Sequence, residues 1–494
     1  MKGFYLILLA VLAGGVSCSD RDSDVVLTAH RITTFTGRGN RNEPLLKLTA
    51  AAETCRIGGV TVSLQADPGN VEMLHLTMND QLLGSVRVVS GKKEYKIACR
   101  AEMTDSSDLI IGADIAADAT EGGFVGADIE QIRINGKRRP VEAPAPGHRE
   151  ILLCRTRIFS PGDYGSRNYR IPAICTLPDG SLLTATDKRK FNQTDLPEDI
   201  DIVACRSLDG GHTWSEPVTI AEGKGYGKGF GDAVLVVTAE GNVVCGFSGG
   251  ADLWKSTPEN PQQNWISISS DLGQTWSAPV DVTAMQWGPE AVNPECRDSH
   301  SAFFGSGHGL LLTREPYAGR ILFVTAVATR DNRLDNYAFW SDDGGKTWQI
   351  STMAYRGGDE AKVVELSDGR VLMSVRQNGA RGWNISEDGG KTWGTQQRWT
   401  DIVTNACNGD IIRYNDEILL HSLPNSMERK NVSIFMSFDE GKTWPKTKTL
   451  CPYESVYSSL TLLPDGTIGA YIEENPTGDC EMWFLSFSLD WLRK

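Results

Sequence analysis

Short apolar runs alternate with short polar turns along most of this chain. After residue 151 one unit recurs six times, in which an apolar strand, a polar turn and a second apolar strand follow one another. Turns such as Asp179-Gly180 and Asp465-Gly466 lie between apolar runs, and Asp-Gly in that setting is a strong signal for a β-hairpin. The pattern therefore predicts an all-β protein built from repeated hairpins.

Five of these hairpins are each followed by one further strand and then by an octet of the form Ser-x-Asp-x-Gly-x-Thr-Trp. Its Asp can accept bonds from nearby backbone N–H groups, its Gly accepts a sharp bend, and its Trp gives the turn an apolar face. Each copy therefore predicts a turn between two strands, with a scaffold role rather than contact with a ligand. Six hairpins and five octets predict a six-bladed β-propeller. The octets are residues 207–214, 269–276, 341–348, 386–393 and 437–444.

The part before the first hairpin has a different organisation. Residues 25–139 contain strand-like segments and no octet, and this spacing predicts a smaller β-sandwich that serves as an accessory domain, with glycan binding as one role. Residues 140–150 are rich in Pro and predict a stiff linker. The propeller is expected over residues 151–494.

Residues 1–18 have the composition of a signal peptide, with Lys2, an apolar run and then small residues before Cys18. A Cys in this position resembles the bacterial lipoprotein signal, in which that residue is lipidated. The acidic residues 19–24 would then form a tether. We expect an exported protein attached to the outer membrane or held in the periplasm through Cys18, with plain secretion as the alternative.

The formal net charge of −14 argues against nucleic acid as a partner, because phosphate binding requires basic surface. An anionic ligand would have to be held by local Arg side chains. The seven His residues are scattered, and no Cys or His spacing typical of zinc sites occurs. We expect a monomer without metal or cofactor.

Counting from the hairpin turns places several polar residues at one level of the propeller. In a hairpin, the start of the first strand and the end of the second strand lie at the same end, opposite the turn. The connections between second and third strands emerge at this end as well, whereas the octets face the other way. Clustered Arg and carboxylate side chains around a phenol favour a carboxylate-bearing ligand and acid/base chemistry. The strand-end residues are Arg170, Asp187, Asp232, Glu360, Arg376, Tyr457 and Glu473, and the connections carry Asp195 and Arg429.

The segment Tyr169-Arg170-Ile171-Pro172, together with the five octets, resembles the bacterial exo-sialidases. These are six-bladed propellers marked by an Arg-Ile-Pro motif and by repeated Asp boxes, and the resemblance covers about residues 154–490. It implies that three arginines hold the carboxylate of the substrate. They are Arg170, Arg376 and Arg429.

The resemblance also implies roles for the remaining residues. Tyr457 corresponds to the nucleophile and Glu360 to the base that activates it. Asp195 corresponds to the acid/base residue, and Asp187 is the alternative for that role. Glu473 resembles the residue that orients the first arginine, while Asp232 and Arg189 resemble residues that line the sugar.

The resemblance thus implies a retaining exo-α-sialidase that acts on sialylated glycans of host glycoproteins and glycolipids. A neutral phenol suits this substrate, because a carboxylate nucleophile would meet the carboxylate of sialic acid. Two alternatives stay open at this point: a trans-sialidase with the same residues, and a propeller that binds glycan or protein without catalysis.

Overall fold

The computed structural model describes residues 26–51, 54–67, 69–139, 141, 144, 147–475 and 478–494. The predicted signal peptide, Cys18 and the tether of residues 19–24 lie outside the described residues, as does part of the predicted linker. No helix in the described part of the chain combines the length and the hydropathy that crossing a membrane requires.

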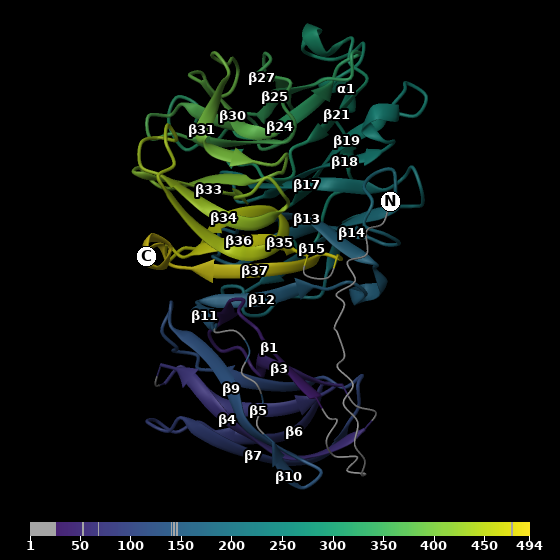
Figure 1. Cartoon of the computed structure of the whole chain (residues 1–494). Helices are drawn as coiled ribbons and strands as arrows, with labels where there is room; N and C mark the ends of the chain where they lie inside the picture. The colour runs from purple at the N-terminus through teal and green to yellow at the C-terminus, as the bar shows by residue number, and fades with distance from the viewer. Residues whose placement is uncertain are drawn as a thin grey trace. The chain divides into compact units, whose positions relative to one another are not determined.

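The chain forms two compact units (Figure 1). Of the described residues, the first contains 26–33 together with those within 41–116 and 124–149. The second contains residues 150–494 and two short segments, residues 34–40 and 117–123. The chain therefore enters the second unit three times, at residues 34, 117 and 150.

Two sheets make up the first unit. Along β7 every second residue is buried up to Cys99, so one face of its sheet packs inward and the other is exposed. In one sheet the order is β1 (Val26–Arg31), β3 (Glu43–Ala51), β8 (Leu109–Ile115), β5 (Val71–Met78), β6 (Gln81–Arg87). In the other, β4 (Cys55–Ala66) lies between β7 (Glu94–Met103) and β9 (Phe124–Ile134), and β10 (Lys137–Arg139) pairs with β9.

The described strands of the second unit form six antiparallel four-stranded sets. The first set is β13 (Asn168–Thr176), β14 (Leu182–Arg189), β15 (Ile200–Ser207) and β16 (Val218–Ala221), and the second is β17 (Phe230–Val237), β18 (Val243–Gly250), β19 (Gln262–Ser269) and β20 (Val280–Asp281). The third set is β21 (Ser301–Phe304), β24 (Ile321–Ala328), β25 (Leu334–Ser341) and β26 (Gln349–Ile350), and the fourth is β28 (Ala361–Glu365), β29 (Val371–Val375), β30 (Gly379–Ser386) and β31 (Gln397–Thr404). The fifth set is β32 (Asp410–Asn415), β33 (Ile418–Pro424), β34 (Lys430–Ser437) and β35 (Lys446–Leu462), and the sixth shares the long strand β35 and adds β36 (Ile468–Glu474), β37 (Glu481–Phe487) and β12 (Cys154–Phe159).

Shorter elements connect these sets. The strands are β2 (Thr36–Gly37), β11 (Arg149–Leu152), β22 (Gly307–His308), β23 (Leu310–Leu311) and β27 (Tyr355–Arg356), and the helices are η1 (Asp163–Gly165), η2 (Leu253–Lys255), α1 (Thr283–Gln286), η3 (Pro294–Cys296) and α2 (Leu489–Arg493).

The sets close into a ring. The first strand of the six sets in chain order, β12, pairs with β37, the last of them, and Figure 1 shows the two strands side by side. The inner strand β13 contacts both β17 and β35, so the first set also lies next to the last. Buried apolar side chains fill the space between neighbouring sets, and all ten cysteines in the described part are buried and free. The predicted all-β propeller with an additional β unit is confirmed.

Each octet is a turn between the third and fourth strands of a set, as the sequence predicts. In all five copies the Ser hydroxyl accepts the Gly N–H, and the Asp carboxylate accepts both the N–H and the hydroxyl of Thr. In the copy that contains Asp271, the Thr275 N–H and hydroxyl are 2.8 and 2.5 Å from the carboxylate. These contacts lie within eight residues, so each octet folds by local hydrogen bonding. The other copies repeat these contacts.

We expect Asp271→Ala to lose about 1 kcal/mol of unfolding free energy, because three hydrogen bonds to a solvent-accessible carboxylate disappear. The hydroxyl and N–H of Thr275 lower the pKa of Asp271 to about 2, so the folded protein binds fewer protons there than the unfolded chain. The contribution is complete above a pH of about 5, is largely present at about pH 4 and is lost as pH falls towards 2. Urea unfolding at these pH values measures it.

Glu290→Ala, at an exposed carboxylate, is the matched control and should leave the unfolding free energy unchanged. A loss in Asp271→Ala that stays constant from pH 4 to 2 would contradict this role of the carboxylate.

Candidate active site

A β-bulge interrupts the first strand of three sets at the same level. The register gains one residue between Arg170 and Ala173 in β13, between Gly231 and Val234 in β17, and between Ser455 and Ser458 in β35. A bulge re-aims the side chains next to it, and bulges are common beside active sites. Two of the residues in these bulges, Ile171 and Asp232, have φ of 62° and 59°; a positive φ is uncommon for any residue other than glycine and most of all for a β-branched one such as Ile171. Arg170, Asp232 and Tyr457 therefore owe their direction to these bulges.

Glu473 in β36 ties two of the bulged strands together. Its carboxylate accepts two hydrogen bonds from the Arg170 guanidinium, at 3.2 and 2.9 Å, and one each from the backbone N–H of Ile171 and Tyr457, at 2.6 and 3.2 Å. Burial alone would raise the pKa of Glu473, but the Arg170 charge and the two N–H groups keep it below its ordinary value. Glu473 is thus an ionised anchor that orients Arg170.

Tyr457, Glu360 and Arg376 meet at one point. The Tyr457 hydroxyl donates to Glu360 Oε2 at 2.7 Å, and Arg376 Nη1 donates to the same hydroxyl at 2.9 Å and also to Glu360 Oε2. Arg376 Nε lies 3.1 Å from Asp359 Oδ2. Burial raises the pKa of Tyr457 well above its ordinary value, and the Glu360 carboxylate raises it further, while Arg376 and Arg170 oppose the change. The phenol is therefore protonated and already bonded to a base.

The other two predicted arginines both lie near the same ring. The guanidinium carbon of Arg170 is 5.4 Å from the centroid of the Tyr457 ring, and that of Arg429 is 5.8 Å from it. Arg429 is exposed, and its Nη2 lies 3.5 Å from the carbonyl oxygen of Ala406. The structure thus brings Arg170, Arg376 and Arg429 together around one phenol.

A second cluster surrounds Arg189. Arg189 Nη2 is 3.1 Å from Asp187 Oδ2 and 3.2 Å from Asp195 Oδ1, and Nη1 donates to the carbonyl of Gln193 at 2.7 Å. The Arg189 side chain is 1% exposed and the Asp187 side chain 0%, whereas the Asp195 side chain is 57% exposed. Arg189 thus links the buried end of β14 to the connection that contains Asp195. Its predicted role in lining the sugar stays a prediction.

The carboxylates of this cluster differ in electrostatic setting. Burial raises the pKa of Asp187 to about 7; the charge of Asp195 adds to the rise and that of Arg189 opposes it. Asp187 also accepts the Asp232 N–H at 3.1 Å. Burial, Asp195 and Asp187 together raise the pKa of Asp232 well above its ordinary value. Of the two candidates for an acid/base role, only Asp195 is open to a ligand.

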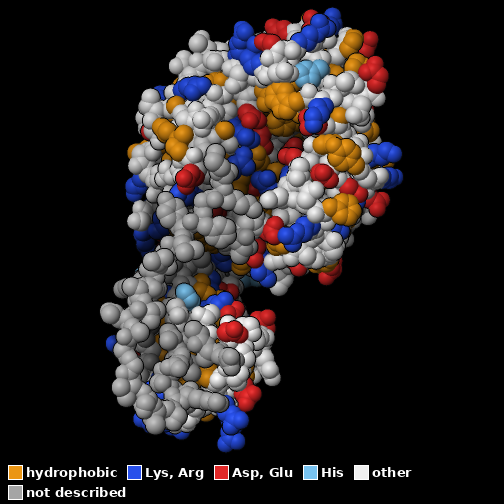
Figure 2. Space-filling model, turned by 45° about the vertical axis from the view of Figure 1, so that its right-hand side comes forward, with side chains coloured by type: hydrophobic (Ala, Val, Ile, Leu, Met, Phe, Trp, Pro, Cys, Tyr) orange, Lys and Arg blue, Asp and Glu red, His pale blue; other side chains and the backbone are white. Residues whose placement is uncertain are grey.

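A cavity of about 270 Å³ joins the two clusters. Its lining includes five of the predicted residues, namely Asp195, Asp232, Glu360, Arg376 and Tyr457. Figure 2 shows acidic and basic side chains close together in the hollowed middle of one propeller face. Among the described residues, no group of three or more His, Cys, Asp or Glu side chains is placed to hold a metal ion.

The sequence did not identify the remaining lining residues. Asp359 could have been found as the neighbour of Glu360, and Gln262 as the first residue of the third strand in its set. No periodic signal marks the others: residues 252–254 lie in or beside η2 in an irregular connection, Leu196 lies in the connection after β14, and Phe303 ends the short strand β21 without a turn motif. The lining residues that were missed are Leu196, Asp252, Leu253, Trp254, Gln262, Phe303 and Asp359.

Comparison with known proteins agrees with this architecture. Residues 192–470, more than half of the chain, match the model of the BNR repeat-like domain. The sialidase of Micromonospora viridifaciens is 32% identical over 377 residues, which are 71% of this chain and 56% of that protein. The sialidase of Bacteroides fragilis is 28% identical over 382 residues, which are 71% of this chain and 68% of that protein.

Among solved structures, a Hadza microbial sialidase superposes with a TM-score of 0.72 at 22% identity, over 94% of this chain and 99% of that one. This likeness concerns the fold. The match to the Micromonospora protein spans little more than half of that relative's length. The chain therefore belongs to the BNR repeat-like family, with which its octets are consistent, and its resemblance to the bacterial sialidases is confirmed.

Proposed function

We propose that the chain is a retaining exo-α-sialidase, which hydrolyses terminal α-ketosidically linked sialic acids from glycoproteins, glycolipids and oligosaccharides. The contact that carries this proposal is the hydrogen bond from the Tyr457 hydroxyl to Glu360, with Arg376 bonded to both groups. This contact places a phenol that is bonded to a base next to a cation that can bind the carboxylate of the substrate. A propeller that only binds glycan has no need of a buried phenol bonded to a base.

The three arginines account for recognition of the sialic acid carboxylate. Charge-assisted hydrogen bonds of this kind contribute about 1.5–3 kcal/mol each. Because the whole chain carries a net charge of −14, its overall field repels an anionic substrate. The local positive charge of Arg170, Arg376 and Arg429 therefore has to overcome this field at short range.

Tyr457 is the proposed nucleophile. As its oxygen attacks the anomeric carbon, its proton passes to Glu360, which lies within the distance that general-base catalysis requires. Arg376, which donates to the phenol oxygen, stabilises the negative charge that develops there. A bond forms between the Tyr457 oxygen and the anomeric carbon, and the bond from that carbon to the glycosidic oxygen breaks.

Asp195 is the proposed acid/base residue, because it is the exposed carboxylate at the edge of the cavity. It protonates the departing glycosidic oxygen in the first step. In the second step it takes a proton from a water molecule, which attacks the anomeric carbon and releases the phenol. Tyr457 regains its proton from Glu360. Two displacements at the same carbon give net retention of configuration.

An assay on defined α2,3-, α2,6- and α2,8-linked sialosides tests the proposal, with the products followed by NMR. We expect free sialic acid that appears first as the α anomer. A product in which the sialic acid is attached to an added acceptor, with little free sugar, would indicate a trans-sialidase. No cleavage of any linkage would favour the non-enzymatic alternative.

Tyr457→Phe removes only the attacking oxygen. We expect kcat on an aryl sialoside to fall by roughly 10³-fold or more, because the covalent step is lost. Affinity for a sialic acid analogue should change by less than about threefold, since the arginines remain. Tyr453→Phe is the control, because it removes a hydroxyl from the same strand at a site outside the cavity. Turnover of Tyr457→Phe at the wild-type rate would refute the assignment.

Arg376→Lys keeps the positive charge but loses the planar fork that matches a carboxylate. We expect affinity for a sialic acid analogue to fall by roughly 10-fold or more in calorimetry, since one charge-assisted hydrogen bond or more is lost. Arg376→Ala should weaken binding further. Arg330→Ala, which alters an exposed ion pair, is the control for loss of an arginine. Equal losses of binding and of thermal stability in Arg376→Lys would favour a purely structural role.

A further inference from the structure

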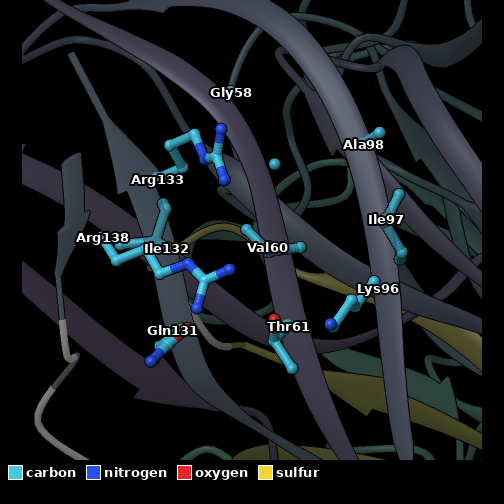
Figure 3. Close-up of a pocket in the computed structure, with 11 residues that line it drawn as sticks. Gly58, Val60, Thr61, Lys96, Ile97, Ala98, Gln131, Ile132, Arg133 and Arg138 are labelled. Atoms are coloured by element: carbon cyan, nitrogen blue, oxygen red, sulfur yellow. The ribbon is translucent and has the colours of Figure 1, made fainter. Parts of the chain in front are cut away.

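A groove with basic walls lies on the exposed face of one sheet of the first unit. Strand pairing places Arg138 opposite Arg133, Arg133 opposite Gly59, and Gly59 opposite Ala98, across β10, β9, β4 and β7. The next exposed row consists of Gln131, Thr61 and Lys96. Figure 3 shows the two arginines on one side of the β4 strand and Lys96 on the other. We call this feature the basic groove, lined by Lys96, Arg133, Arg138, Gln131, Thr61 and Gly58–Gly59.

Two glycines form the floor of the basic groove. Pairing of β4 shifts by one residue between Ile57 and Gly59 on both sides of the strand, and Gly59 has a φ of +135°. A Cβ at Gly59 would lie 2.8 Å from the carbonyl oxygen of Ile97, and a Cβ at Gly58 would lie 3.1 Å from Cδ of Arg133. Glycine therefore permits the bulge, leaves the floor without side chains and leaves room for the Arg133 stem. The groove that results has a volume of about 320 Å³.

The positive charges in the basic groove repel one another. Arg133 and Arg138 face each other directly across two strands, and like charges in that position destabilise a sheet. Within the described residues, no carboxylate lies within 4 Å of the charged groups of Arg133, Arg138 or Lys96, and no carboxylate lines the groove. No carboxylate of the described residues thus offsets this repulsion, and a bound anion would reduce it.

We propose that the basic groove binds a sulfated oligosaccharide. Three cationic side chains along one groove match several anionic groups on a chain, whereas the single carboxylate of a sialic acid would leave two of them unpaired. Arg forks bind oxyanions through two parallel hydrogen bonds, and Gln131 and Thr61 supply donors and acceptors for sugar hydroxyls. The lining contains no aromatic side chain, so recognition rests on charge rather than on stacking against a neutral sugar.

Calorimetry on the full chain tests this site with a heparin tetrasaccharide and its chemically desulfated form. We expect binding of the sulfated probe that weakens as salt rises from 50 to roughly 500 mM, because screening shortens the reach of the cations. The desulfated probe should bind at least 10-fold more weakly. Equal binding of the two probes, or equal competition by sialyllactose, would overturn the proposal.

Arg133→Ala/Arg138→Ala should weaken binding of the sulfated tetrasaccharide at least 10-fold. Arg87→Ala removes an exposed arginine from the other sheet of the same unit and should change it less than twofold. Hydrolysis of a small sialoside should be the same in all three proteins, and the probe contains no sialic acid, so failure here is separable from failure of the proposed function. Unchanged binding in the double variant would assign the probe to another surface and overturn the proposal.

A separate measurement distinguishes a ligand site from a structural role. Because Arg138→Ala removes repulsion, its thermal midpoint should equal or exceed that of the wild type. A fall of several degrees would show that Arg138 stabilises the sheet, and would contradict the account of the groove. Arg133→Lys/Arg138→Lys keeps both charges and should retain part of the affinity, which shows that the loss in the alanine variants does not come from misfolding.

Discussion

The carboxylate of Glu473 is the point on which the proposed active site depends. It is buried, and an isolated charge in that position would be very costly, so it requires the Arg170 guanidinium and the two backbone N–H groups that it accepts. The same four hydrogen bonds hold the bulges of β13 and β35 in register with β36. Arg170 lies 303 residues away in the sequence and Tyr457 lies 16 residues away. One residue therefore sets the direction of a substrate-binding arginine and the position of the proposed nucleophile.

The two ends of the propeller use carboxylates in opposite ways. The Asp residues of the octets are closed by bonds within their own turns, and these bonds hold the pKa of Asp271 and Asp343 near 2. At the other end, burial raises the pKa of Asp187 and Asp232. Local hydrogen bonding stabilises the ionised form, whereas desolvation among like charges opposes it. The octets therefore stabilise the fold, whereas the carboxylates with raised pKa lie at the end of the propeller where catalysis is proposed.

Counting residues from each hairpin turn predicted the strand-end residues well, because every residue of a strand advances the chain by about the same distance. It brought Asp232, Glu360, Arg376 and Tyr457 to one end, and the structure places all four around the cavity. Counting placed Asp187 at a strand end and Asp195 in a connection, but only their burial shows that Asp195 is the one open to a ligand. Trp254 and Phe303 were missed because loop conformation and packing between sets, which leave no period in the sequence, bring them to the cavity.

In the proposed mechanism, Tyr457 forms the covalent bond to the sugar. The most direct measurement uses a sialic acid derivative with fluorine at the reacting carbon and its neighbour, which slows the release of a covalent intermediate, followed by peptide mass spectrometry of the inactivated protein. We expect one added sialyl group on the peptide that contains Tyr457, and none in Tyr457→Phe. A label on Glu360 or Asp195, or rapid turnover of the reagent with no labelled peptide at any time, would contradict this mechanism.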